Sequence, residues 1–141
     1  MSLNEESKEL LIKSALQARK AAYAPYSNYA VGAALFTKSG KMYLGGNIEN
    51  ASYGGTNCAE RTAFFKAVSE GERGFTAIAI AGGMIGEEPT EYAYPCGICR
   101  QVMQEFADSE FQVFVVKSVS DYKAYKLSEL LPFGFGGQSI R

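Results

Sequence analysis

The chain has 141 residues, 47% of them hydrophobic, and its 14 Lys and Arg against 15 Asp and Glu leave a net charge of −1. This apolar content excludes an extensively disordered chain, and the lack of excess basic charge argues against a nucleic-acid partner. No run approaches the roughly 20 continuous apolar residues of a membrane span, and the first residues lack a secretory signal pattern. We therefore expect one cytoplasmic domain over residues 1–141, with a small-molecule ligand and neither nucleic acid nor membrane as partner.

The first part of the sequence predicts a helix followed by a hairpin. Apolar residues recur at helical spacing over residues 5–22, and Pro25 disfavours helical geometry in the residue before it. A continuous apolar run over 29–36 predicts a buried strand. Turn residues at 38–41 connect it to a second strand, expected over 42–48.

After a polar, Gly-rich loop, the rest of the sequence predicts two further helices and three further strands. One helix is expected at about 58–70, ended by Gly71, and the other at about 97–107. The strands are expected at 75–81, 111–116 and about 122–126, with a long acidic connection over 82–94. The resulting order, αββαβαββ, predicts mixed α/β layers.

Two features of the composition restrict the chemistry. The sequence has no histidine, so every nucleophilic mechanism built on a Ser-His or Cys-His pair is excluded. It has three cysteines, Cys58, Cys96 and Cys99, and an odd number disfavours a framework of disulfides. Acid–base chemistry must therefore come from carboxylates, lysines, tyrosines or a metal-bound water.

The three cysteines stand at the starts of two predicted helices. Helix N-termini favour anions, which lowers the pKa of a thiol and favours the thiolate that a metal requires. Cys96 and Cys99 have the C-x-x-C spacing that binds zinc, and Cys58 would come from the other helix. Three thiolates leave one tetrahedral position open, as in catalytic zinc sites. If the helix points end-on at the metal, Glu60 can reach the water there as a proton shuttle.

Other interpretations of the same residues stay open at this point. A fourth ligand would make the zinc structural, C-x-x-C is also typical of thioredoxin-type redox pairs, and a third cysteine is often a buried apolar residue. Glu60 alone is typical of a first helical turn, and Arg61 of a surface ion pair.

Short blocks of sequence, taken together, resemble the small homotetrameric cytidine deaminases. The zinc base deaminases carry a signature ending in P-C-x-x-C, with an upstream ligand close to a Glu that is not itself a ligand. The three-cysteine variant of that signature is matched by Cys58-Ala59-Glu60 and Pro95-Cys96-Gly97-Ile98-Cys99. The further matching blocks are 24–27, 31–35, 46–51, 58–63 and 129–132, and the resemblance extends roughly from Tyr26 to Phe135.

The resemblance implies a fold and an activity. The fold is a three-layer α/β/α sandwich with a five-stranded mixed sheet, and the oligomer is a homotetramer whose sites are completed by neighbouring subunits. The activity is zinc-dependent hydrolysis of cytidine, and of deoxycytidine, to the uridine nucleoside and ammonia in pyrimidine salvage. One Zn²⁺ per chain would be bound by Cys58, Cys96 and Cys99, with Glu60 transferring protons and Arg61 hydrogen-bonded to the thiolates.

The resemblance also implies the residues that bind the nucleoside. Asn47 and Glu49 would hold the ribose, since an amide and a carboxylate can together donate to and accept from a sugar hydroxyl. Tyr29 stands where the family commonly has a Phe that packs on the base, and the Ala59 backbone would read the base edge. Tyr53 and Phe135 are similar to residues that such tetramers contribute to a neighbour's site. From periodicity alone, Tyr29 is a core strand residue and Asn47 a turn former.

The alternatives are a deaminase of another aminopyrimidine nucleoside such as blasticidin S, a nucleic-acid editor, or a non-catalytic zinc or thiol module. The pair Asn47 and Glu49, suited to a ribose, argues against the first, and the lack of basic charge against the second. The chain departs from the family pattern at Tyr94, in the acidic 84–94 connection and in the Gly-rich tail after Phe135.

Overall fold

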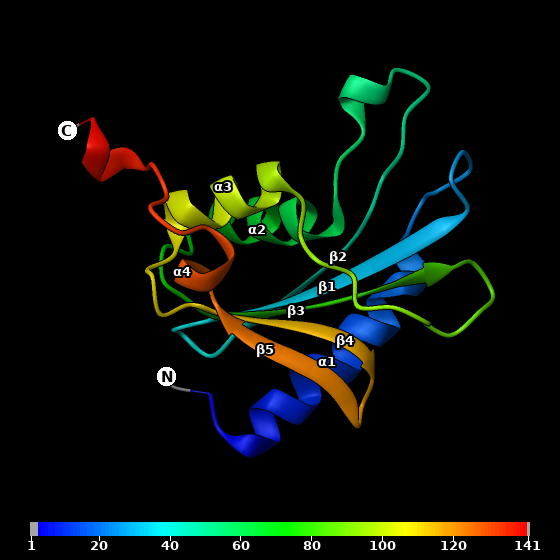
Figure 1. Cartoon of the computed structure of the whole chain (residues 1–141), viewed down its shortest axis with the longest axis horizontal. Helices are drawn as coiled ribbons and strands as arrows, with labels where there is room; N and C mark the ends of the chain where they lie inside the picture. Colours follow the sequence, from blue (N-terminus) through cyan, green and yellow to red (C-terminus); the bar gives the residue numbers. More distant parts are fainter. Residues whose placement is uncertain (1–2, 141) are drawn as a thin grey trace.

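A computed structural model describes residues 3–140, apart from the side chain of Gln138. Helices cover both faces of one sheet (Figure 1). The α-helices are α1 (Glu5–Ala18), α2 (Ala59–Ser69), α3 (Gly97–Phe106) and α4 (Leu127–Leu130). The strands are β1 (Tyr29–Thr37), β2 (Met42–Gly46), β3 (Phe75–Met84), β4 (Gln112–Ser118) and β5 (Asp121–Lys126). Short 3-10 turns cover Arg19–Ala21, Tyr53–Gly55 and Gly137–Ser139.

The five strands form a mixed sheet in the order β2-β1-β3-β4-β5. Strands β3 and β4 are parallel, and every other neighbouring pair is antiparallel. The parallel pair requires a crossover, and α3 supplies it. The expected α/β class and the five-stranded mixed sheet are therefore confirmed, and the expected αββαβαββ order is present with one short helix, α4, added after β5 that was not predicted.

Side chains alternate between two apolar layers, one on each face of the sheet. Leu35, Ile78 and Val113 pack with α2 and α3, whereas Phe36, Ala79 and Phe114 pack with α1. This alternation follows from the two-residue period of a strand. Both faces of the central strands are covered, which is why the run over 29–36 is apolar throughout.

Four predicted boundaries were wrong. Strand β4, expected to end at residue 116, extends to Ser118. Helix α1 ends at Ala18 and continues only as the 3-10 turn to Ala21. Strand β2 stops at Gly46, because Ile48 makes isolated bridges to Tyr23 and Asn57 instead. Strand β3 extends to Met84, since its two glycines pair with β1 rather than starting the loop.

No helix in the described part of the chain has both the length and the apolar character needed to cross a membrane.

Candidate active site

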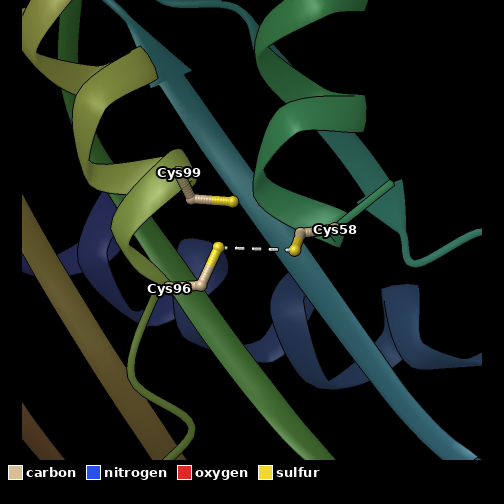
Figure 2. Close-up of side chains that lie close together, drawn as sticks. All are labelled: Cys58, Cys96 and Cys99. Carbon is tan, nitrogen blue, oxygen red and sulfur yellow. Dashed lines mark hydrogen bonds between the residues drawn. The ribbon is translucent and has the colours of Figure 1, made fainter. Parts of the chain in front are cut away.

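The three cysteines come together where two helices begin. Cys58 is the N-cap of α2 and Cys96 the N-cap of α3, and Cys99 is the third residue of α3. Their sulfur atoms point toward one another (Figure 2) and all lie within 4.8 Å of each other. The Sγ atoms of Cys58 and Cys96 are 3.7 Å apart. The predicted convergence of the thiols is therefore present in the fold.

The geometry of these sulfurs fits zinc. Zn–S bonds of about 2.3 Å in a tetrahedron place two sulfurs roughly 3.8 Å apart, close to the observed 3.7 Å. Among the described residues, the cluster contains these three thiols and no fourth His, Cys, Asp or Glu ligand atom. A tetrahedral ion held here would keep one open position, as catalytic zinc sites do.

Arg61 supplies positive charge beside the thiols. Its Nη2 donates to Cys58 Sγ at 3.4 Å, while its buried Nε has no hydrogen-bond partner among the described residues. The pKa of Cys58 is lowered to about 5, chiefly because the Cys99 thiol donates to its sulfur, and Arg61 and Cys96 add to the effect. Cys58 thus favours the thiolate form that a metal binds, whereas the hydrogen bond to Cys58 and burial raise the pKa of the Cys99 thiol.

Glu60 is a buried carboxyl next to the thiols. It is the second residue of α2 and only 4% exposed. Burial raises its pKa to about 7, because desolvation penalises the charged form. Cys58 and Glu60 both line one cavity of about 370 Å³, as the end-on approach of the helix predicts.

Three of the predicted substrate residues share this cavity: Tyr29 at the start of β1, Asn47 just after β2, and Ala59 at the start of α2. Six residues of the wall were not singled out for this role from the sequence: Val31, Thr56, Asn57, Ile80, Ala93 and Tyr94. Thr56 and Asn57 could have been identified from the sequence, because they directly precede Cys58.

Asn47 is fixed by the neighbouring strand. Its Oδ1 accepts from Val31 N at 2.9 Å, and its Nδ2 donates to Tyr29 O at 2.9 Å. The side chain therefore continues the β1–β2 ladder beyond Gly46. One amide hydrogen and one lone pair stay available for a ligand.

Glu49 and Tyr53 line an adjacent hollow of about 260 Å³, and Thr56 lines both spaces. The Glu49 carboxylate accepts from Tyr26 N at 3.0 Å, Ser27 N at 3.1 Å and the Ser27 hydroxyl. These bonds, that of the Ser27 side chain above all, lower the pKa of Glu49. Glu49 is thus a fixed, ionised acceptor at the margin of the cavity.

Two predicted residues project outward. Tyr53 is 78% exposed on the 49–57 loop, although its ring forms a T-shaped pair with the Tyr26 ring, with 6.4 Å between the centroids. Phe135 is 58% exposed, and its carbonyl accepts from Gln101 Nε2 at 2.6 Å. We call the cavity that contains Cys58 and Cys96 the thiol cavity. Among the described residues, neither Tyr53 nor Phe135 lines it.

The turn before Cys96 is held by a residue that the sequence did not single out. Arg100 Nε donates to Pro95 O at 2.8 Å, and its Nη1 donates to Leu130 O at 2.7 Å. Arg100 could have been identified from the sequence, because it directly follows the C-x-x-C motif and lies one helical turn beyond Cys96. Arg100 thereby joins the start of α3 to the end of α4.

Comparison with known proteins agrees with this geometry. The family model for the cytidine and deoxycytidylate deaminase zinc-binding region matches residues 5–115. A cytidine deaminase of Halalkalibacterium halodurans is 48% identical over 133 residues, covering 94% of this chain and 97% of that protein. A probable cytidine deaminase of Dictyostelium discoideum is 42% identical over 140 residues, covering 98% of this chain and 90% of that protein. The crystal structure of cytidine deaminase from Burkholderia pseudomallei has a TM-score of 0.83 and 44% identity, covering 94% of this chain and 100% of that one.

The mixed sheet, the paired helix N-termini and the three-thiol cluster define a zinc-dependent deaminase enzyme of the α/β class. Within that class, the chain belongs to the cytidine deaminase family.

Proposed function

We propose that this chain hydrolyses cytidine, and deoxycytidine, to the uridine nucleoside and ammonia, with Glu60 as the proton-transfer residue. The observation that carries the proposal is a buried carboxyl in the same cavity wall as Cys58 and Cys96. We propose Cys58, Cys96 and Cys99 as the ligands of one zinc ion per chain. When bound, zinc acts as a Lewis acid that makes water a better nucleophile near neutral pH.

Glu60 has the properties of a general acid–base catalyst. With a pKa of about 7 it can both accept and release a proton at neutral pH. In the proposed reaction it takes a proton from the attacking water. It passes that proton to N3 of the pyrimidine, then takes the proton of the new C4 hydroxyl and delivers it to the departing amine, so that the C4 carbonyl forms as ammonia leaves. The chain has no histidine, and Glu60 is the carboxyl among the described residues of the cavity wall.

Arg61 is proposed to balance the charge of the centre. Three thiolates and one Zn²⁺ carry a net charge of −1, which weakens the effect of the metal on water. The guanidinium at 3.4 Å from Cys58 Sγ offsets that charge. The two helix N-termini act in the same direction.

The two adjacent spaces suit the two parts of a nucleoside. We propose that the base lies in the thiol cavity beside Tyr29 and Ala59, and that the sugar extends toward Glu49 in the second hollow. Asn47 lines the first space, and its free amide hydrogen can donate to a sugar hydroxyl while the Glu49 carboxylate accepts. Buried polar groups of this kind discriminate against ligands that lack the matching hydroxyl.

We also propose that the enzyme is a homotetramer of the cytoplasm. The support for assembly is the exposure of Tyr53 and Phe135, two aromatic side chains that could enter a neighbour's site. A reducing compartment keeps the three thiols available for zinc. Sedimentation of the zinc-loaded protein at four times the chain mass is expected, and a monomer with full activity would contradict the shared site.

The activity is tested by following ultraviolet absorbance with cytidine, deoxycytidine, free cytosine and blasticidin S. We expect turnover of the two cytidine nucleosides and about one zinc per chain by metal analysis. Turnover of blasticidin S alone, or a zinc-loaded protein without activity on any of the four, would refute the proposal. Tight, salt-sensitive retention of single-stranded DNA would instead favour a nucleic-acid substrate.

The role of Glu60 is tested by Glu60→Gln, which keeps the shape of the side chain but removes its titration. We expect unchanged zinc content and a kcat lower by about 10²–10⁴-fold. Glu70→Gln, at the other end of α2, is the matched control and is expected to keep wild-type kcat. Wild-type turnover in the zinc-loaded Glu60→Gln protein would exclude Glu60 as the proton-transfer residue.

A further inference from the structure

Gly82, near the end of β3, supports the ring of Tyr29. A Cβ atom placed on Gly82 would lie 2.8 Å from Tyr29 Cε2, 3.0 Å from Tyr29 Oη and 3.0 Å from the Ala93 Cβ. Separations this short are well inside the roughly 3.5–4.0 Å of ordinary carbon contacts. The Tyr29 ring therefore occupies the space that any side chain at Gly82 would need.

The strand register explains this contact. Gly82 pairs with Val31, and Tyr29 pairs with Met84, so Tyr29 and Gly82 are diagonal neighbours on β1 and β3. Diagonal neighbours across a strand pair lie within reach of an aromatic side chain. Both residues face the α2 and α3 side of the sheet, because Val31 and Ile80, two residues from each, pack there. A glycine in a strand marks such a close approach.

The contact lies at the edge of the thiol cavity. Tyr29 and Ala93 both line that cavity, together with Glu60. Because β3 lies behind the ring and Ala93 flanks it, a ring displaced from Gly82 moves into the cavity.

We propose that Gly82 is a positioning residue that sets how far the Tyr29 ring projects into the cavity, and so how well the flat base fits. The inference rests on the proposed function, since it takes the ligand of the cavity to be a pyrimidine nucleoside. A residue of this kind acts on binding rather than on proton transfer. It affects the substrate and the transition state alike, so its loss raises KM and leaves kcat nearly unchanged.

The test compares Gly82→Ala in the wild-type chain and in a Tyr29→Leu chain, which lacks the ring atoms in question. In the wild-type chain we expect Gly82→Ala to raise the KM for cytidine about tenfold, with kcat changed less than about threefold. The dissociation constant of the product uridine, measured by calorimetry, should rise by the same factor. In the Tyr29→Leu chain, Gly82→Ala should change the KM for cytidine and the dissociation constant of uridine by less than about twofold, since positions 29 and 82 are then uncoupled.

Gly83→Ala is the matched control. It makes the same change on the same strand, but its Cβ meets Arg19 Nη2 and Pro89 rather than Tyr29. We expect its KM to remain at the wild-type value.

The outcomes separate this inference from the proposed function. An inactive wild-type enzyme refutes the function, whereas an active enzyme whose KM is unaltered by Gly82→Ala refutes the inference. Equal effects of Gly82→Ala with and without the Tyr29 ring also refute it. If the Gly82→Ala protein does not fold, the protein with both Gly82→Ala and Tyr29→Leu must fold, and its failure to fold overturns the inference.

Discussion

Replacing Gly45 with alanine should displace the start of α2 and so disturb the active site. Gly45 lies in β2 under the first turn of α2. A Cβ there would be 2.5 Å from Ala59 O, 2.7 Å from Ala63 N and 3.0 Å from Thr62 Cβ. Two of these atoms belong to the helix backbone, so no rotation of a side chain relieves the contact. The helix itself must move away from the sheet.

The size of the effect follows from these distances. Bringing the closest contact from 2.5 Å to an ordinary separation requires α2 to retreat by about 1 Å at Ala59. Overpacking of this kind lowers the free energy of unfolding by about 1–3 kcal/mol. Ala59 stands between Cys58 and Glu60, so both would move with it. A misplacement of about 1 Å can cost about 10²-fold in rate.

We therefore expect Gly45→Ala to lower the free energy of unfolding by about 2–3 kcal/mol in urea titrations and kcat/KM by about 10–100-fold. The control is Gly71→Ala just beyond the other end of α2. Gly71 has a φ of +102°, and a Cβ added there would have no neighbouring side chain or backbone within 4 Å. That variant should lose about 1 kcal/mol because alanine disfavours a left-handed backbone, but it should keep wild-type kcat/KM. A Gly45→Ala enzyme with the stability and kcat/KM of the wild type would refute the reasoning.

Three further predictions concern the charges and the phenols around the cavity. Arg61→Ala should weaken zinc binding about 10–100-fold in a chelator competition, because the group that holds the ligand sulfur is lost; unchanged affinity would count against the charge-balance role. Glu49 has a pKa below its ordinary 4.5, so its binding contribution is lost only as the pH falls through that lowered value. The KM of Glu49→Gln divided by the KM of the wild type should therefore be constant between about pH 5 and 8; a ratio that falls toward one between about pH 6 and 5 would contradict this. Tyr125→Phe removes the 2.7 Å bond to the Tyr94 hydroxyl at an exposed position and should lower stability by less than about 1 kcal/mol in thermal unfolding; a larger loss would mean that the bond fixes the 84–94 connection.

The sequence predicts those parts of the fold whose cause is local. The apolar run over 29–36 and the helical spacing over 58–70 led to β1 and α2 within one residue at each end. Gly71, expected as a left-handed cap, has φ of +102°. In each case the sequence pattern depends on the burial of those same residues, or on the positive φ of the glycine itself.

Two of the wrong boundaries, the ends of β3 and β2, depend on distant partners. Gly82 and Gly83 read as the start of a loop, yet they continue β3 because β1 lies beside them and pairs with them. Asn47, interpreted locally as a turn former, instead completes the ladder of β1 through its side chain. Nothing within a few residues of either position encodes which strand lies alongside.

The same distinction applies to the proposed site. The three cysteines could be proposed as ligands because metal ligation restricts both residue type and spacing, and Glu60 could be proposed because it lies two positions after Cys58. Ala93 and Tyr94 enter the cavity wall from the 84–94 connection, where the Tyr94 hydroxyl is hydrogen-bonded to Tyr125 of β5, and no motif records such a distant contact. Tyr53 and Phe135 lie outside the thiol cavity of their own chain, so their proposed role depends on a neighbouring subunit.

The convergence of the site residues follows from the topology of the sheet. A short connection leads from the end of α2 to the start of β3, so α2 begins near the end of β3; α3 follows β3 and begins at that same end (Figure 1). Strand β1 runs antiparallel to β3 and starts there with Tyr29, and β2 runs antiparallel to β1 and ends there just before Asn47. One end of the sheet thus collects two helix N-termini, the start of β1 and the ends of β2 and β3. Thiolates gain stability from helix N-termini, and open sheets bind ligands beyond the carboxyl ends of their parallel strands. The order of the elements therefore places the thiols at two helix N-termini, at the end of the sheet where a cavity can form.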